Sequence, residues 1–164
     1  MGLKFNVGCG KNDKGKDWVH VDAADFHHVI NSDITLSNEK TESAAIIYAS
    51  HIIAYFDRIE IVGVLKEWFR VLEPCGVLDI STPDWDILKT LKSPLTGPLY
   101  GRMQSAGKMI YHKTVYDYHD LYTVLRAAGF IDIKRWDFVS GENDCSSSTY
   151  DGKEISLNIK CTKP

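Results

Sequence analysis

Two apolar runs that flank one amphipathic segment constrain this chain more than any other feature. Ala44 to Ala49 is a continuous apolar run, the pattern of a strand buried on both faces of a parallel sheet. A helix is expected next, because Asp57 and Glu60 form a capping pair and Pro74 follows the last apolar residue of a helical pattern; that pattern comprises Ile61, Leu65, Trp68 and Leu72. Residues 76–81 then return as a strand. Strand, helix and strand in this order predict a parallel pair with a right-handed crossover.

A glycine turn follows the first predicted strand. Residues 3–7 alternate apolar with polar and end at Gly8-Cys9-Gly10, a strand that runs into a tight turn. Residues 11–17 are wholly polar and too few to cover a sheet face, so the first crossover is abbreviated. Residues 18–22 form a second short strand that ends on Asp22, and residues 28–33 are a plausible third.

The second half of the chain completes a single α/β domain over residues 1–164. Residues 83–113 are expected to form a loop or cap with short helical pieces, a candidate substrate lid. A helix is predicted over 117–128, with Gly129 at its C-terminal cap. Strands are predicted over 130–138 and 155–162, joined by an exposed polar loop over 140–153.

Composition and charge exclude several classes of partner. The 164 residues are 44% hydrophobic, enough for a core without disulfides, and the net charge of -3 disfavours nucleic acid as a partner. The most apolar stretch is too short for a membrane span, and the N-terminus lacks the hydrophobic region of a secretion signal, so a cytoplasmic protein is expected. No two cysteines have metal or redox spacing, which predicts four reduced thiols: Cys9, Cys75, Cys145 and Cys161.

The glycine turn narrows the class of ligand. A phosphate loop fails because Asp17 stands where a hydroxyl is required, and the dinucleotide fingerprint fails because Asp13 replaces its third glycine. A ligand with a ribose and no phosphate remains, since Asp22 can accept hydrogen bonds from two hydroxyls. S-adenosylmethionine is such a ligand. The alternative role for Asp22 is to cap the following turn.

The chain resembles a known family in these and further segments. Phe5-Asn6-Val7-Gly8-Cys9-Gly10 and Trp18-Val19-His20-Val21-Asp22 look like the opening of the short class I S-adenosylmethionine-dependent methyltransferases. Four further segments are similar to that family: Tyr48-Ala49-Ser50-His51, Trp68 to Pro74, Ser81-Thr82-Pro83-Asp84 and Ala127-Ala128-Gly129-Phe130. The resemblance implies a Rossmann-like, mostly parallel seven-stranded sheet whose last strand is antiparallel.

The resemblance also implies roles for individual residues. The methionine part of the cofactor would lie beside Gly8, Cys9 and Gly10, and Asp22 would hold the ribose. The adenine would lie against Asp33 and Ile34, and the sulfonium against Ala49 and Ser50. His51 would face the substrate pocket, and His112 in the lid would contact substrate.

Histidine supplies the candidate catalytic groups. Methyl transfer needs the acceptor held in line in a dry pocket, and His51 has a pKa suited to removing its proton near neutral pH. The alternatives are that His51 only bonds a neighbouring loop and that His112 is a solvated loop residue. His27 and His28 resemble the start of a metal site, but no third ligand has a useful spacing, so no metal is assigned.

The most concrete functional reading is a methyltransferase for a small-molecule acceptor, such as a saccharide or a surface-polymer precursor. No Asn-Pro-Pro-Tyr motif of amino-group methylation of nucleic acids or proteins follows the fourth strand. A second reading is a catalytically inactive protein that binds the cofactor or a partner, which the short polar segment 11–17 favours because it leaves the methionine end open to water. A nicotinamide enzyme is a third. The sequence does not indicate an oligomeric state.

Overall fold

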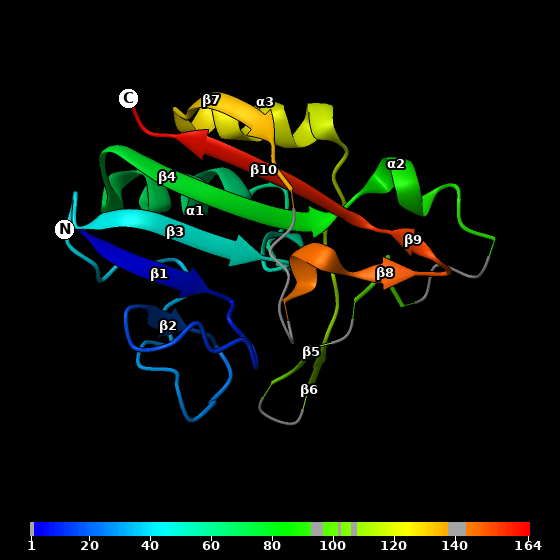
Figure 1. Cartoon of the computed structure of the whole chain (residues 1–164), viewed down its shortest axis with the longest axis horizontal. Coiled ribbons are helices and arrows are strands. Elements are labelled where there is room, and N and C mark those ends of the chain that lie inside the picture. The colour runs from blue at the N-terminus through cyan, green and yellow to red at the C-terminus, as the bar shows by residue number, and fades with distance from the viewer. Residues whose placement is uncertain (1, 93–96, 102, 106–107, 138–143) are drawn as a thin grey trace.

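One mixed sheet forms the centre of the molecule. The computed structural model describes residues 2–92, 97–101, 103–105, 108–137 and 144–164. Six strands follow the order β2-β1-β3-β4-β10-β7 (Figure 1). Their bounds are Leu3–Val7 for β1, Val19–Val21 for β2, Ala44–Ser50 for β3, Leu72–Pro83 for β4, Ile131–Arg135 for β7 and Ser156–Thr162 for β10.

The predicted parallel pair is confirmed at the middle of this sheet. β3 and β4 run parallel, and α1 (Glu60–Val71) connects them. β4 begins earlier than expected, and its pairing with β3 shifts register near its start. Ala44 pairs with Leu72, whereas Ile46, two residues later, pairs with Val77. The capping pair is also present, since the Asp57 carboxylate accepts from the Glu60 amide at 2.8 Å and the Glu60 carboxylate accepts from the Asp57 amide at 3.0 Å.

The prediction of seven strands is wrong by one within the described part of the chain. The expected third strand, residues 28–33, contributes only a single parallel bridge between Asn31 and Val21. Two side chains turn the backbone away from the sheet there: Asn31 accepts from the Asp33 amide, and Asp33 accepts from the Thr35 amide. The last strand, β10, is antiparallel to both β4 and β7, as expected.

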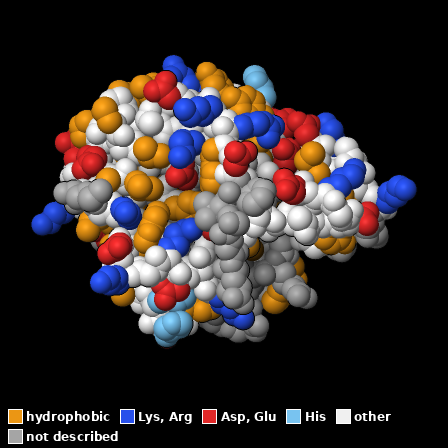
Figure 2. Space-filling view, in the orientation of Figure 1, with side chains coloured by type: hydrophobic (Ala, Val, Ile, Leu, Met, Phe, Trp, Pro, Cys, Tyr) orange, Lys and Arg blue, Asp and Glu red, His pale blue; other side chains and the backbone are white. Residues whose placement is uncertain are grey.

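Among the described residues, the two longest helices cover one face of the sheet (Figure 1). α1 and α3 (Tyr118–Ala128) contact each other and lie behind the sheet in Figure 1. Their apolar sides and alternate strand residues form the core, which includes Trp68, Leu121, Phe5, Ile47 and Leu78. Residues 11–17 contain no helix, as their polarity predicts. The opposite face, seen in Figure 2, carries mixed polar and apolar side chains.

The two segments predicted as a lid and as an exposed loop contain short elements. Within 83–113 lie α2 (Trp85–Leu88) and a hairpin of β5 (Met103–Ser105) and β6 (Lys108–Ile110); residues 93–96, 102 and 106–107 lie outside the description.

Within 140–153 lie η2 (Cys145–Ser147) and the hairpin β8 (Thr149–Tyr150) and β9 (Lys153–Glu154). The expectation that this segment is exposed is wrong at Asp144 and Ser146, which are buried because Asp144 caps η2 and bonds Tyr48. Residues 140–143 lie outside the described ranges. None of the helices described is long and apolar enough to cross a membrane.

Candidate functional site

The glycine turn lies at the carboxyl end of β1, where parallel strands open a crevice. Gly8 and Gly10 both have left-handed backbones, with φ of 66° and 52°. A Cβ atom at Gly8 would lie 2.5 Å from Cβ of Ile52, so a larger residue cannot pack there. A Cβ atom at Gly10 would meet nothing within 4 Å. Gly8 is therefore required by packing, while Gly10 faces open space.

Asp22 holds this turn through its carboxylate. Oδ2 accepts from the Gly10 amide at 2.8 Å, and Oδ1 accepts from the Ala24 amide at 2.8 Å. The side chain is buried, with 4% exposed. The two predicted roles of Asp22, to bind the ribose and to cap the following turn, are compatible, because each carboxylate oxygen can accept from a second donor.

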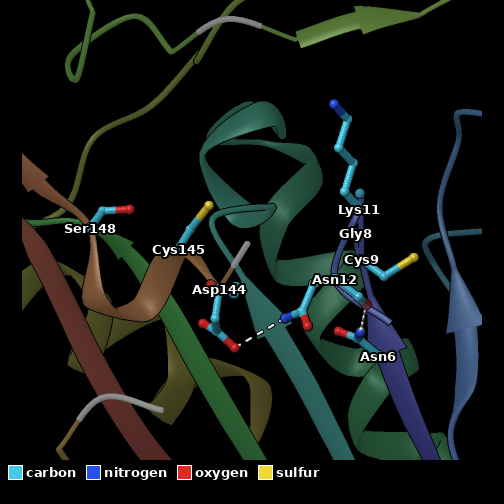
Figure 3. A pocket seen from close by; sticks show the side chains of 10 residues that line it. Asn6, Gly8, Cys9, Lys11, Asn12, Asp144, Cys145 and Ser148 are labelled. Atoms are coloured by element: carbon cyan, nitrogen blue, oxygen red, sulfur yellow. Dashed lines mark hydrogen bonds between the residues drawn. The ribbon is translucent and has the colours of Figure 1, made fainter. Parts of the chain in front are cut away.

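A cleft of about 380 Å³ opens above the turn (Figure 3). It brings together four residues predicted from the sequence, Gly8, Cys9, Gly10 and Ser50, with six others: Asn6, Lys11, Asn12, Asp144, Cys145 and Ser148. A second hollow of about 300 Å³ is lined by Asp22 and by residues 23–25 and 29–32. The bond from Gly10 to Asp22 lies between the two hollows. Both fall near the lower end of the size range of small-molecule sites.

Three further predicted cofactor residues lie away from the lining of these hollows. Ala49 is fully buried in the core. Asp33 accepts bonds from Thr35, Ser37 and Asn38; burial alone would raise its pKa, but these bonds outweigh burial and lower it. Ile34 packs against the core, and its carbonyl accepts from the Trp68 indole at 3.1 Å.

Asp144 crosses the cleft and was not predicted from the sequence. Its carboxylate accepts from the Tyr48 hydroxyl at 2.6 Å, from Asn12 Nδ2 at 3.0 Å and from Lys14 Nζ at 3.1 Å. It thus links the segment before η2 to β3. It also links that segment to residues 11–17, which lie more than a hundred residues away along the chain. A lone Asp in a polar segment gives no sequence signal for such a contact.

The electrostatics of this network favour an ionised Asp144 and a neutral Tyr48. Burial would raise the pKa of Asp144, but hydrogen bonds from Tyr48 and Ser146 and the charge of Lys14 lower it below 3.8. Burial and the Asp144 carboxylate raise the pKa of Tyr48. Lys14 Nζ also lies 3.9 Å from the centre of the Tyr48 ring. The network therefore combines one ion pair, Lys14 with Asp144, with two neutral donors, Tyr48 and Asn12.

The backbone of Cys9 lines the cleft, and its sulfur lies on the side of the turn away from Asp144 (Figure 3). Sγ lies 3.6 Å from His28 Nε2. Burial raises the pKa of Cys9 to about 12, so the sulfur is a protonated thiol at neutral pH. All four cysteines are free, as predicted.

His51 directly follows β3, with a left-handed φ of 54°. Its Nε2 lies 2.8 Å from Ser156 Oγ, which donates its own proton to the Cys145 carbonyl at 2.8 Å. Nε2 therefore donates to Ser156, and Nδ1 keeps a free lone pair. Burial, with a smaller contribution from His112, lowers the pKa of His51 to about 4. The ring is neutral at pH 7.

His112 lies in a different hollow. Its Nδ1 donates to the Leu99 carbonyl at 3.0 Å, and its ring packs edge-on against Tyr55 at 4.7 Å between centroids. It lines a hollow of about 180 Å³ with Arg58 and Tyr100 among its neighbours. Burial lowers the pKa of His112. Neither histidine lines the cleft above the glycine turn.

Several solved structures with a similar architecture are S-adenosylmethionine-dependent methyltransferases. One from Archaeoglobus fulgidus is 14% identical, with a TM-score of 0.65 over 99% of this chain and 86% of that one. A possible histamine N-methyltransferase from Thermotoga maritima is 16% identical, with a TM-score of 0.62 over 100% of this chain and 83% of that one.

A third structure contains ligands. It is the 1,6-didemethyltoxoflavin-N1-methyltransferase of Burkholderia thailandensis, with 1,6-didemethyltoxoflavin and S-adenosylhomocysteine bound. It is 12% identical, with a TM-score of 0.62 over 98% of this chain and 70% of that one. No protein-family model matches the chain, and no curated protein matches it in sequence.

The chain has the Rossmann-like methyltransferase fold. The predicted fold class is therefore confirmed in its architecture, with six strands in place of seven. At these identities the likeness concerns the fold alone.

Proposed function

We propose that the protein is an S-adenosylmethionine-dependent methyltransferase for a small-molecule acceptor. The observation that carries this proposal is the pair of hollows on either side of the Gly10–Asp22 hydrogen bond. A nucleoside and an amino acid joined through sulfur need two adjoining compartments of this kind.

The residues present fit that cofactor in polarity and in space. Gly10 faces open space where a side chain would stand, and the buried Ser50 hydroxyl in the cleft wall makes no hydrogen bond of normal geometry. Asp22 would accept from the ribose hydroxyls, and the second hollow would take the adenine. Lys11 lines the first cleft and forms no ion pair among the described residues, so its ammonium is free for the methionine carboxylate.

The cofactor supplies an electrophilic methyl group, and the protein's part is to position the acceptor and exclude water. His51 would act as base through Nδ1, since Nε2 is engaged with Ser156. A pKa near 4 makes it a weak base, which suits an acceptor that loses its proton during or after transfer. His112 would contact the acceptor from the segment 83–113. A hydroxyl or amine of a saccharide-like molecule remains the expected acceptor.

The second candidate is a protein that binds the cofactor without catalysis. Hydrogen bonds cross the first cleft from Asn12 and Lys14 to Asp144. In addition, no helix covers segment 11–17. Both features leave a shallower methionine compartment.

Calorimetric titration with S-adenosylhomocysteine, and separately with NAD, tests the proposal. We expect binding of the first compound only. Asp22→Asn should weaken it by about 1 to 3 kcal/mol through lost ribose bonds, and exposed Asp17→Asn should leave it unchanged. Binding of NAD alone, or of neither compound, would contradict the proposal. Turnover of a candidate acceptor then separates the enzyme from the inactive binder, since His51→Asn should lower the rate without changing cofactor affinity.

A further inference from the structure

A cluster of potential metal ligands lies at the edge of the molecule beside β2. One donor atom from each of Asp13, His27 and His28 lies within 4.8 Å of the others. Asp13 belongs to the polar segment after β1, and the two histidines belong to the loop after β2. Figure 2 shows histidine side chains gathered over the loops next to β2. The sequence offered no third ligand near His27 and His28, because Asp13 is supplied by a different loop.

Each residue of this cluster has a potential ligand atom without a hydrogen-bond partner among the described residues. Within the described ranges, Oδ2 of Asp13 accepts no hydrogen bond, and neither ring nitrogen of His27 has a hydrogen-bond partner. Nδ1 of His28 is buried and has no partner. A buried nitrogen without a partner is costly, and a bound cation or water removes that cost.

His28 is also held in the orientation that a ligand needs. Its Nε2 lies 3.6 Å from Cys9 Sγ, and its ring stacks on Phe26 and packs edge-on against His20 and His27. Metal-binding histidines commonly engage their second nitrogen with a neighbouring group, which fixes the ring and leaves the other lone pair for the ion. Cys9 occupies that supporting position.

We propose that Asp13, His27 and His28 bind a divalent transition metal, with Zn²⁺ as the best fit. Two imidazoles and one carboxylate suit zinc, cobalt, nickel or copper, and do not suit magnesium or calcium, which prefer all-oxygen sites. Zinc–ligand bonds of about 2 Å separate donor atoms by roughly 3.3 Å. The exposed side chains of Asp13 and His27 would rotate on binding to bring the donor atoms to that spacing. The fourth position is left to water.

Such an ion would crosslink the two loops that border the hollows, the segment after β1 and the loop after β2. The first crossover lacks the helix that would otherwise hold the segment after β1 against the sheet. Because metal binding to a folded site adds to folding free energy, an ion here would order residues 11–17 and 23–28. This inference does not depend on the proposed methyltransferase activity.

Zinc chloride titrated by calorimetry into tag-free protein, first stripped of metal with a chelator, tests the site. We expect one equivalent to bind, with no heat from magnesium chloride. Asp13→Asn and His27→Ala replace exposed side chains without disturbing the core, and each should weaken zinc binding about tenfold or more. His119→Ala, an exposed histidine on α3, is the matched control and should bind as the parent does.

Thermal unfolding gives a second readout. Zinc should raise the melting temperature of the parent and of the His119→Ala variant equally, and should raise that of His27→Ala less. Equal zinc affinity in the parent, Asp13→Asn and His27→Ala would overturn the proposal. Neither measurement requires S-adenosylhomocysteine, so failure of the metal site and failure of the methyltransferase proposal are distinguishable.

Discussion

Asp144 illustrates how one buried carboxylate can organise a cleft from a distance. It accepts bonds from donors on two separate segments: Tyr48 on β3, and Asn12 and Lys14 in the polar segment 11–17. Only 8% of the residue is exposed, so these bonds compensate for the lost hydration of its charge. The shape of the cleft above the glycine turn therefore depends on this side chain.

Replacing Asp144 by Asn should destabilise the protein by about 1.5 to 3 kcal/mol. The amide keeps the size of the side chain but turns a donor toward Asn12 Nδ2 and Lys14 Nζ, which are themselves donors. Urea unfolding at pH 7 measures the difference. Asp137→Asn is the control, because exposed Asp137 forms no hydrogen bond or ion pair among the described residues. Equal losses in the two variants would show that the network contributes nothing.

The same pair of variants yields a pH dependence. The pKa of Asp144 is lowered in the folded protein, so its ionised form stabilises the fold above 3.8, and that stabilisation decreases as the pH falls through the lowered value. The stability gap between the parent and Asp144→Asn should therefore narrow as the pH is lowered from 7 to 3. A gap that stays constant across this range would contradict a lowered pKa.

His51 predicts a second, separate pH effect. Its pKa falls from 6.5 to about 4 on folding. Between pH 6.5 and pH 4, therefore, His51 is protonated in the unfolded chain and neutral in the folded protein. Stability contributed by the neutral ring is present above pH 6.5 and decreases toward pH 4, by on the order of 3 kcal/mol. His51→Asn, which tolerates the left-handed backbone, should lack this decrease. Urea unfolding at pH 7 and pH 4.5 compares the two, and a parallel decline would exclude burial of a neutral His51.

At the scale of elements, the two glycines of the turn after β1 offer a matched comparison. Gly10→Ala introduces a methyl group into open space and should cost about 1 to 2 kcal/mol from its left-handed backbone alone. Gly8→Ala adds a clash with Ile52 and should cost roughly 2 to 5 kcal/mol. Denaturant unfolding measures both. Equal costs would mean that the turn relaxes freely around Ile52.

The elements that were predicted correctly are those whose signal is local. The apolar run of β3, the capping pair of α1 and the glycine after α3 each specify structure within a few residues. The wrong predictions concern segments whose structure is determined by side-chain contacts rather than by the local pattern. Asn31 and Asp33 terminate the third strand through side-chain turns, and Asp144 is drawn into the interior by partners at positions 12, 14 and 48.

The candidate site divides in the same way. Glycine and a strand-ending carboxylate have a spacing that indicates a ligand crevice, and Gly8, Gly10 and Asp22 do meet there. The opposite wall comes from the C-terminal third of the chain, and no pattern in the sequence connects Asp144, Cys145 or Ser148 to the turn after β1. Asp13 was not predicted as a neighbour of His27 and His28 for the same reason, because it lies on a different loop.

At the scale of the whole molecule, the two longest described helices, α1 and α3, lie on the same side of the sheet (Figure 1). α1 contacts β4 in the middle of the sheet and α3 contacts β7 at one edge, while β2, at the opposite edge, is a three-residue strand and the loops around it contain no helix. Segments with few buried contacts open locally at free energies below that of global unfolding. The two hollows proposed to hold the cofactor lie at this weakly supported end of the sheet, next to Gly10 and Asp22.

Hydrogen exchange should therefore be slowest in β3 and β4 and much faster over residues 8–33. S-adenosylhomocysteine should slow exchange at the amides of residues 8–24, because a ligand that binds only the closed form lowers the population of the open one. The hollow between α1 and α3 lined by Ile61 and Tyr116 serves as an internal control and should be unaffected. Protection at that hollow without protection at the glycine turn would move the binding site to the helical face and refute the assignment of Gly10 and Asp22. Protection confined to the turn and its neighbouring loops would mean that the ligand supplies the order that a crossover helix would otherwise provide.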